Sequence, residues 1–278
     1  FEVYGSGWAW DDYMESYMVP RSAFPMYGNM VDISRTSADS IHIFPEYFRE
    51  KAIHITSYKN GFDVKREFYN NRLTISEGPL ENKKVPFHTD EETITGLLED
   101  RLKIKASFIN QGIDSGYFTP IYSRPSDSLF TPMMHNSDNY LAEQVLLMAG
   151  NTYLGYMSDE MIIDSLLKSS LHDVPQKPRW ADGSGLSRYN LFTPKSFVYI
   201  LEKMKNEFGM ERMKTILPTG GKGSLSQLFD SASGYIFAKS GTLSNNSALS
   251  GYLYTEKGKL LIFSILINHY PGKSAPVR

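Results

Sequence analysis

The sequence contains no cysteine, and this absence excludes a disulfide framework, a thiolate metal site and a cysteine nucleophile. The six histidines are scattered without an HExxH or similar ligand spacing, so a zinc enzyme is not expected. Nothing in the sequence calls for another metal or an organic cofactor. A large excess of one charge is also lacking, because 29 lysine and arginine residues balance 31 aspartate and glutamate residues. This balance gives no global attraction to nucleic acid or anionic lipid.

Long apolar runs are missing as well. The longest, residues 260–267, has the length of a strand and is interrupted by Ser264, whereas a membrane-spanning helix needs about 18 or more apolar residues. No transmembrane segment is therefore expected. The 278 residues include 41% hydrophobic and 13% aromatic residues, proportions typical of a folded protein with one large domain or two smaller ones.

Short β-rich runs characterise the first half of the chain. Residues 1 to about 35 are aromatic and interrupted by glycine and proline, and we interpret them as a loop. Runs at 41–44, 53–58 and 73–76, with turn residues such as Asn60-Gly61 between them, predict a small β-rich subdomain. Residues 91–103 then show a helical spacing of apolar residues behind Asp90 as N-cap.

The second half favours helices followed by strands. Apolar residues recur at helical spacing in three segments, at 138–148, 158–169 and 194–208. Strands are predicted at 235–239, 248–255 and 260–269, the last two forming a hairpin through the polar turn 256–259. This succession indicates an α/β (α+β) fold, in which helices pack on an antiparallel sheet.

Three short patterns are candidates for chemistry. Ser137-Asp138-Asn139 stands at the head of a predicted helix, where such residues are ordinary N-caps. Residues 182–188, DGSGLSR, form a glycine-rich loop that is not GxGxxG, so a structural loop is the default interpretation. Lys239-Ser240-Gly241-Thr242 ends a strand and places a lysine beside two hydroxyls, an arrangement that suits an anionic ligand. Elements of the S-D-N and K-T-G type, together with S-x-x-K, occur in penicillin-binding proteins and class A β-lactamases.

Longer words around these patterns carry a more specific resemblance. They are GWAWDDY at 7–13, SDNYLAEQVL at 137–146, DGSGLSRYNLFTP at 182–194, LPTGGKGSL at 217–225 and AKSGTLSNNSALSGYL at 238–253. In this order they resemble the penicillin-binding protein 4 type of D-alanyl-D-alanine carboxypeptidase, a low-molecular-mass group whose penicillin-binding domain carries large inserted domains.

The resemblance implies a penicillin-binding, serine β-lactamase-like fold with an antiparallel sheet flanked by helices. Residues 1–130 would be mostly a β-rich inserted domain, and residues 131–278 the C-terminal half of the penicillin-binding domain. The implied activity is that of a periplasmic or cell-envelope carboxypeptidase or endopeptidase. It would act through an acyl-enzyme on peptidoglycan peptides ending in D-Ala-D-Ala, with β-lactams as inhibitors. Assembly into a homo-oligomer is compatible with this interpretation.

The resemblance also implies roles for individual residues. The implied catalytic residues are Ser137, Asn139 and Lys239, and the implied substrate-binding residues are Ser240, Gly241 and Thr242. The serine of S-D-N would relay a proton towards the leaving amine, its asparagine would hold the substrate amide, and the lysine would supply positive potential. The two hydroxyls of K-S-G-T would bind the terminal carboxylate, and the threonine N–H would be one oxyanion-hole donor.

The sequence departs from the family pattern in one respect, because no S-x-x-K element, which would carry the nucleophile, precedes S-D-N. In relatives it lies before the GWAWDDY region, which corresponds to a position before residue 1. The one lysine with a serine three residues earlier is Lys168, which follows Ser165 within a predicted amphipathic helix. We interpret this pair as an ordinary surface pair because it comes after S-D-N. The chain is therefore expected to be the C-terminal portion of a longer polypeptide and not to acylate alone.

Two alternatives remain open at this point. One is a non-catalytic relative that binds cell-wall peptides or a partner protein through the same groove. The other is a β-lactamase-like hydrolase with a different substrate.

Overall fold

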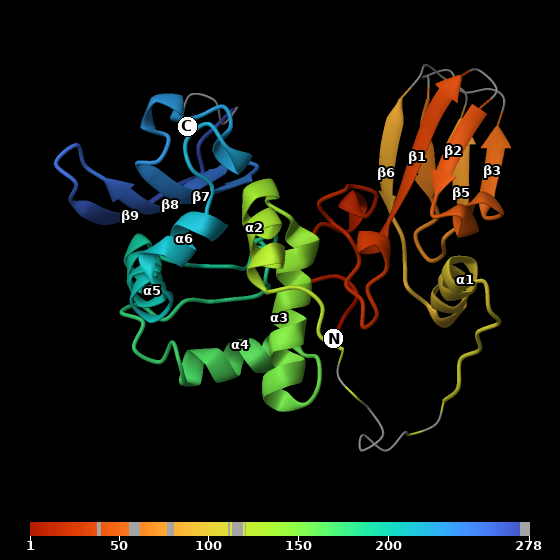
Figure 1. Cartoon of the computed structure of the whole chain (residues 1–278), viewed down its shortest axis with the longest axis horizontal. Coiled ribbons are helices and arrows are strands. Elements are labelled where there is room, and N and C mark those ends of the chain that lie inside the picture. The colour runs from red at the N-terminus through yellow and green to blue at the C-terminus, as the bar shows by residue number, and fades with distance from the viewer. Residues whose placement is uncertain are drawn as a thin grey trace. The chain divides into compact units, whose positions relative to one another are not determined.

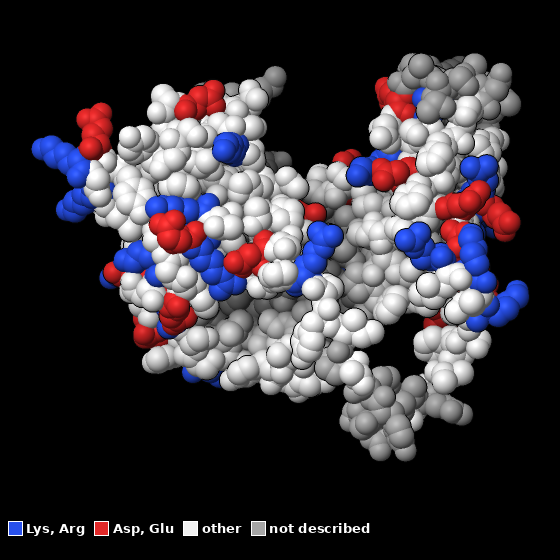
Figure 2. Space-filling model, in the orientation of Figure 1, with Lys and Arg blue, Asp and Glu red and all other residues white. Residues whose placement is uncertain are grey.

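The computed structural model of the protein describes residues 1–37, 40–55, 62–76, 81–110, 112, 119 and 121–272. The chain divides into two compact units (Figure 1). The N-terminal unit comprises Glu2–Tyr4 and Ala9–Tyr122, and the C-terminal unit comprises Phe1, Gly5–Trp8 and Ser123–Arg278. On the face drawn in Figure 2, acidic and basic side chains are interspersed in each unit, in keeping with the balanced composition.

The N-terminal unit contains two three-stranded sheets, with strand orders β2-β1-β6 and β3-β5-β4 in its described residues. Its elements are β1 (Met30–Ser37), β2 (Ser40–Phe44), β3 (Ala52–Ile55), β4 (Val64–Arg66), β5 (Leu73–Ser76), β6 (Asn82–Pro86), α1 (Glu91–Leu102) and the 3₁₀ turns η1 (Trp10–Asp12), η2 (Tyr27–Asn29) and η3 (Glu46–Arg49). All strand pairs are antiparallel except β3 with β5. One buried core joins these strands to α1, with Ile33, Leu73 and Leu97 fully buried.

The predicted strands at 41–44 and 73–76 are confirmed, and so is the helix behind Asp90, whose carboxylate accepts a hydrogen bond from Thr93 N. Of the run at 53–58, the part up to Ile55 belongs to β3, and the rest lies outside the described residues with Asn60-Gly61. The loop interpretation of residues 1 to about 35 was wrong at its end, because β1 begins at Met30. There the apolar residues alternate with polar ones, and pairing with β2 and β6 holds the segment extended.

The described residues of the C-terminal unit contain the antiparallel sheet β7-β8-β9 with helices packed on it. Its elements are α2 (Asp127–Asn136), α3 (Asn139–Leu154), α4 (Asp159–Lys168), α5 (Pro194–Phe208), α6 (Met210–Ile216), η5 (Gly223–Leu225), η6 (Asp230–Ala232), β7 (Ile236–Leu243), β8 (Asn246–Tyr254) and β9 (Leu260–Asn268). Helix α5 packs on β8 and β9. Tyr252 is fully buried against it and donates a hydrogen bond to Leu201 O at 2.6 Å.

At the start of β7 both faces of the strand are covered, because successive side chains point to opposite faces. Phe237 belongs to the core under α5 and α6, whereas Ile236 and Ala238 pack on the opposite face with Leu225 of η5. The α5 and α4 predictions are confirmed, with Thr193 and Ser158 as N-caps. The hairpin is confirmed as well.

Two helices were not predicted, and two elements are longer than expected. The proline inside α2 obscured its helical pattern, and α6 is only a short helix that starts directly after Gly209. Helix α3 continues beyond residue 148 until Gly155 ends it in a left-handed conformation. Strand β7 runs past residue 239 to Leu243 because β8 pairs with it along that length. Within the described residues, no helix has the length and apolarity needed to cross a bilayer.

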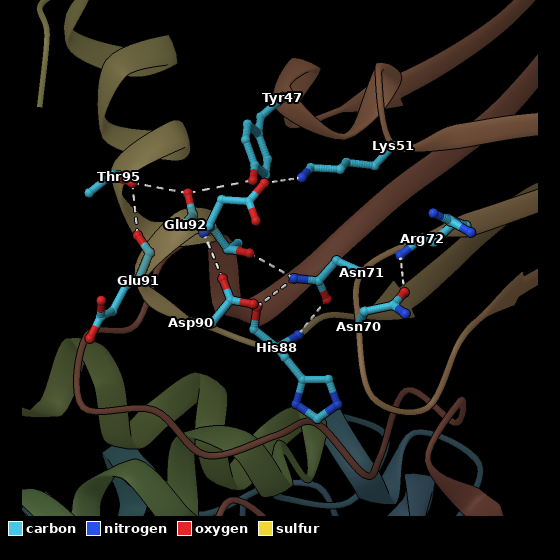
Figure 3. A network of polar contacts seen from close by, with 11 residues as sticks. Tyr47, Lys51, Asn70, Asn71, Arg72, His88, Asp90, Glu91, Glu92 and Thr95 are labelled. Carbon is cyan, nitrogen blue, oxygen red and sulfur yellow. Dashed lines mark hydrogen bonds and ion pairs between the residues drawn. The ribbon is translucent and has the colours of Figure 1, made fainter. Parts of the chain in front are cut away.

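A buried polar network fixes the segment before α1 in the N-terminal unit (Figure 3). The Asn71 side chain donates to His88 O and to Thr93 Oγ1, both at 2.8 Å, and accepts from His88 N at 2.9 Å. The imidazole of His88 lies with Nε2 at 2.9 Å from Phe68 O. Burial, followed by the nearby Arg66 guanidinium, lowers the pKa of His88 below its ordinary value of 6.5.

This shift makes the N-terminal unit sensitive to acid. A folded pKa below the unfolded one means that folding favours the neutral ring, so the stabilisation is full above pH 6.5 and decreases as the pH falls below it. We expect the unfolding temperature of the wild type to drop more than that of His88→Gln between about pH 7 and about pH 5. Calorimetry on both proteins, with the exposed His54→Gln as control, measures this difference. Identical slopes for wild type and His88→Gln would contradict the role of His88.

Candidate functional site

The side chain of Lys239 connects two motifs that lie far apart in the sequence. Its ammonium group donates to Ser137 Oγ at 2.5 Å and to Ser240 O at 2.6 Å. Ser137 lies between α2 and α3, and Lys239 lies on β7. The contact therefore holds the junction of the two helices against the strand.

The S-D-N word is at the same time the end of one helix and the start of the next. Ser137 closes α2 in a left-handed conformation, with φ of 54° and ψ of 47°. Asp138 caps α3 by accepting a hydrogen bond from Leu141 N at 2.9 Å. The ordinary N-cap explanation thus holds for Asp138, while the hydroxyl of Ser137 meets Lys239.

Burial lowers the pKa of Lys239 to about 8. The side chain is cationic at neutral pH and loses its charge in the mildly alkaline range. An ammonium group in such a half-buried position attracts anions more strongly than one in bulk water does. Together with the adjacent hydroxyls, it can bind a carboxylate and polarise a serine hydroxyl.

The remaining predicted site residues lie along the same two elements. Asn139 is the first residue of α3, and it is half-buried. Gly241 and Thr242 continue β7 after Ser240 and are both exposed. The structure thus joins Ser137, Lys239 and Ser240 by hydrogen bonds, with the other three as their chain neighbours.

One hydroxyl of this group was not singled out from the sequence. Ser240 Oγ donates to Ser224 Oγ at 3.2 Å, and Ser224 lies on the short turn η5. The word LPTGGKGSL contains this serine, but nothing in its local pattern assigns chemistry to it. Its relation to Ser240 depends on long-range folding.

The loop at 182–190 has a structural role, as predicted from the sequence for residues 182–188. The carboxylate of Asp182, only 1% exposed, accepts hydrogen bonds from four groups. These are Trp8 Nε1 at 3.0 Å, Gly185 N at 2.9 Å, Ser187 N at 2.6 Å and Asn190 Nδ2 at 2.7 Å. Asp182 therefore ties the beginning of the GWAWDDY word to the DGSGLSR word.

This loop is also fixed against α3 and the end of β7. The buried Glu143 of α3 accepts from Ser184 N at 2.7 Å. A side chain at Gly183 would place its Cβ 2.6 Å from Ala142 O, so only glycine allows this approach. Arg188 donates to Ser244 O, just after β7, at 3.3 Å. The loop thereby connects α3, which begins with S-D-N, to the end of β7, which carries K-S-G-T.

The Ser165 and Lys168 pair behaves as an ordinary helix-surface pair. Ser165 Oγ donates to Met161 O at 2.8 Å, and Lys168 pairs with Asp164 at 2.5 Å, all on α4. Across the described residues, no three histidine, aspartate or glutamate side chains gather as a metal site would require.

The sequence is similar to that of known proteins over nearly its whole length. A family model described as the D-Ala-D-Ala carboxypeptidase 3 (S13) family matches residues 2–277. The D-alanyl-D-alanine carboxypeptidase DacB of Haemophilus influenzae is 31% identical over 158 residues, which cover 53% of this chain and 33% of that protein. The D-alanyl-D-alanine carboxypeptidase of an Actinomadura species is 37% identical over 99 residues, or 33% of this chain and 18% of that protein. The matches thus span a third or less of these curated relatives.

Solved structures agree in fold. The crystal structure of penicillin binding protein 4 from Haemophilus influenzae superposes with a TM-score of 0.75 at 22% identity, covering 100% of this chain and 70% of that one. A second crystal structure of the same protein, complexed with a β-lactam, gives a TM-score of 0.72 at 20% identity, covering 95% and 69%. Identities this low establish likeness of fold only.

We predict that the buried Asp182 carboxylate contributes to the stability of the fold through its four hydrogen bonds. In Asp182→Asn, an amide N–H would face the N–H donors that now surround the carboxylate. We expect the free energy of unfolding to fall by about 2–3 kcal/mol, because buried hydrogen bonds to a charged group are lost. Urea denaturation measures the loss, and the exposed Glu256→Gln on the β8–β9 turn is the matched control. A variant as stable as wild type would show that the four contacts contribute little.

Proposed function

Because the chain belongs to the D-Ala-D-Ala carboxypeptidase 3 (S13) family, we propose that it is part of a serine-type carboxypeptidase or endopeptidase acting on peptidoglycan stem peptides. The observation that carries this proposal is the hydrogen bond from Lys239 to Ser137, which unites S-D-N with K-S-G-T. The site of action would be the periplasm or cell envelope. Residues of the N-terminal unit would form the inserted domain, and the C-terminal unit would contribute half of the penicillin-binding domain.

The proposed substrate is a peptide ending in D-Ala-D-Ala, bound beside the outer edge of β7. Residues 218 and 219 already pair with this edge at Ala238 and Phe237. The substrate would lie beyond that point, with its terminal carboxylate on the hydroxyls of Ser240 and Thr242. Gly241, which has no side chain, allows the peptide to approach the strand closely. Charge and hydroxyl donors together give a preference for a free carboxylate.

The chemical step is nucleophilic acyl transfer. A serine would attack the penultimate carbonyl and lose its proton to the lysine of its S-x-x-K element. The N–H of Thr242 would be one donor to the resulting oxyanion. Asn139 would hold the substrate amide. The leaving D-alanine needs a proton on its nitrogen, which Ser137 would deliver while Lys239 stabilises the developing negative charge on its oxygen. Water would then hydrolyse the acyl-enzyme.

We place the attacking serine outside these 278 residues. The sequence offers one S-x-x-K pair, Ser165 and Lys168, and both side chains are engaged in contacts on α4 itself. This same observation supports a second candidate function, that of a non-catalytic relative that binds cell-wall peptides through β7. β-lactams would be inhibitors of the catalytic form.

Intact-mass spectrometry separates these two functions. After incubation with benzylpenicillin, we expect no mass increment on this chain and one covalent adduct on a polypeptide extended upstream to include an S-x-x-K element. In that longer protein, Lys239→Ala should slow acylation by about 100-fold or more, since it removes a charge that stabilises the transition state. An adduct on this chain that maps to Ser165 would contradict the assignment. An unlabelled longer protein would favour the binding function.

The titration of Lys239 predicts how peptide binding depends on pH. Below its pKa of about 8 the ammonium attracts the terminal carboxylate, and this attraction is lost as the pH rises through that value. We expect the Kd of a D-Ala-D-Ala peptide to rise several-fold between about pH 7 and about pH 9, as measured by NMR titration. Lys239→Arg, which keeps its charge, should give a flat profile. A wild-type Kd that stays constant over this range would contradict the role of Lys239.

A further inference from the structure

We infer that Ser224 is a positioning residue for the carboxylate-binding end of this site and acts through Ser240. The inference rests on the proposed function, because it concerns the same peptide carboxylate. Its basis is the hydrogen bond of 3.2 Å between the two hydroxyl oxygens. It joins Ser224 on η5 to Ser240 on β7, two residues that are 16 positions apart in the sequence.

The turn that carries Ser224 is fixed on both sides of this residue. Leu225 is fully buried and packs against Ile236 and Ala238 of β7. Gly223 has a φ of 56°, and a Cβ there would lie 2.9 Å from Nδ1 and 3.1 Å from Cα of His135 on α2. Backbone hydrogen bonds close the turn, from Leu225 N to Lys222 O at 3.1 Å and from Gly221 N to Leu225 O at 3.2 Å. A hydroxyl between two such anchors has a defined position relative to β7.

The proton count of the two serines explains what Ser224 can do. As the side chains lie, Ser240 donates its single hydroxyl proton to Ser224. To bind a carboxylate, Ser240 must turn this proton towards the ligand, and its oxygen then needs a donor. Ser224 can supply that donor by rotating its own proton, which gives a chain from Ser224 to Ser240 to the carboxylate. Hydroxyls in such a chain polarise one another and strengthen the terminal bond.

Lys239 holds the backbone of Ser240 in place. Its ammonium group donates to Ser240 O, so the backbone of this residue is held from one side and its side chain from another. Ser224 therefore controls the direction of one hydroxyl without contacting the ligand. Its removal should affect recognition of the carboxylate more than recognition of the rest of the peptide.

The test compares two ligands on this chain, diacetyl-L-lysyl-D-alanyl-D-alanine and its C-terminal amide. For Ser224→Ala we expect the Kd of the carboxylate peptide to rise by about threefold to tenfold, the range of one hydrogen bond, while the Kd of the amide changes little. Ser224→Thr keeps a hydroxyl and should restore binding. Ser226→Ala, an exposed serine on the same turn, is the matched control, and NMR titration and thermal unfolding are measured for all variants.

A double-mutant cycle with Ser240→Ala tests whether Ser224 acts through Ser240. If it does, Ser224→Ala adds no further loss once Ser240 is alanine; additive losses would overturn the positioning role. A variant that binds both ligands more weakly by the same factor, with a lowered unfolding temperature, would also overturn it. Wild-type-like binding by Ser224→Ala would overturn the inference alone. A wild-type chain that does not prefer the carboxylate over the amide would overturn it together with the proposed function.

Discussion

The ammonium group of Lys239 has to satisfy two partners at once, a hydroxyl at a helix junction and a carbonyl of its own strand. Removing a cation from water is unfavourable, and the lowered pKa of Lys239 reflects this. Such a group is tolerated only where its acceptors are fixed in place. Much of the C-terminal unit can be understood as the framework that fixes them.

Different contacts hold each part of this framework. The sheet is held to α5 by the buried Tyr252, whose hydroxyl is bonded to Leu201 O. The loop around Asp182 supports α3 through Glu143 and Gly183. The turn η5 is anchored by Leu225 under β7. These contacts involve no site residue, yet they determine where the site residues meet, so substitutions far from Lys239 can still displace it.

Local signals were enough to predict most elements but not how the elements meet. Helix α5 was predicted with its observed bounds because Pro194 marks its start and apolar residues follow at helical spacing. Helix α2 was obscured by Pro132, whereas strand β1 was missed although its alternation of apolar and polar residues is typical of a strand. Family resemblance drew attention to Ser137, Lys239 and Ser240. Ser224 gains its importance from a partner distant in sequence, as does the contact of Asp182 with Trp8, and no local pattern encodes these contacts.

The left-handed backbone at Ser137 limits what mutation can do at this position over evolutionary time. Asparagine and glycine tolerate a φ of 54° but carry no hydroxyl, whereas threonine keeps a hydroxyl but its branched Cβ disfavours that conformation. Asparagine could still accept the hydrogen bond from Lys239, but it has no hydroxyl proton to pass on. Each of these replacements thus loses either the hydroxyl or the backbone preference that serine supplies. A substitution at this position would therefore separate descendants that keep the proposed proton relay from descendants that keep only the fold.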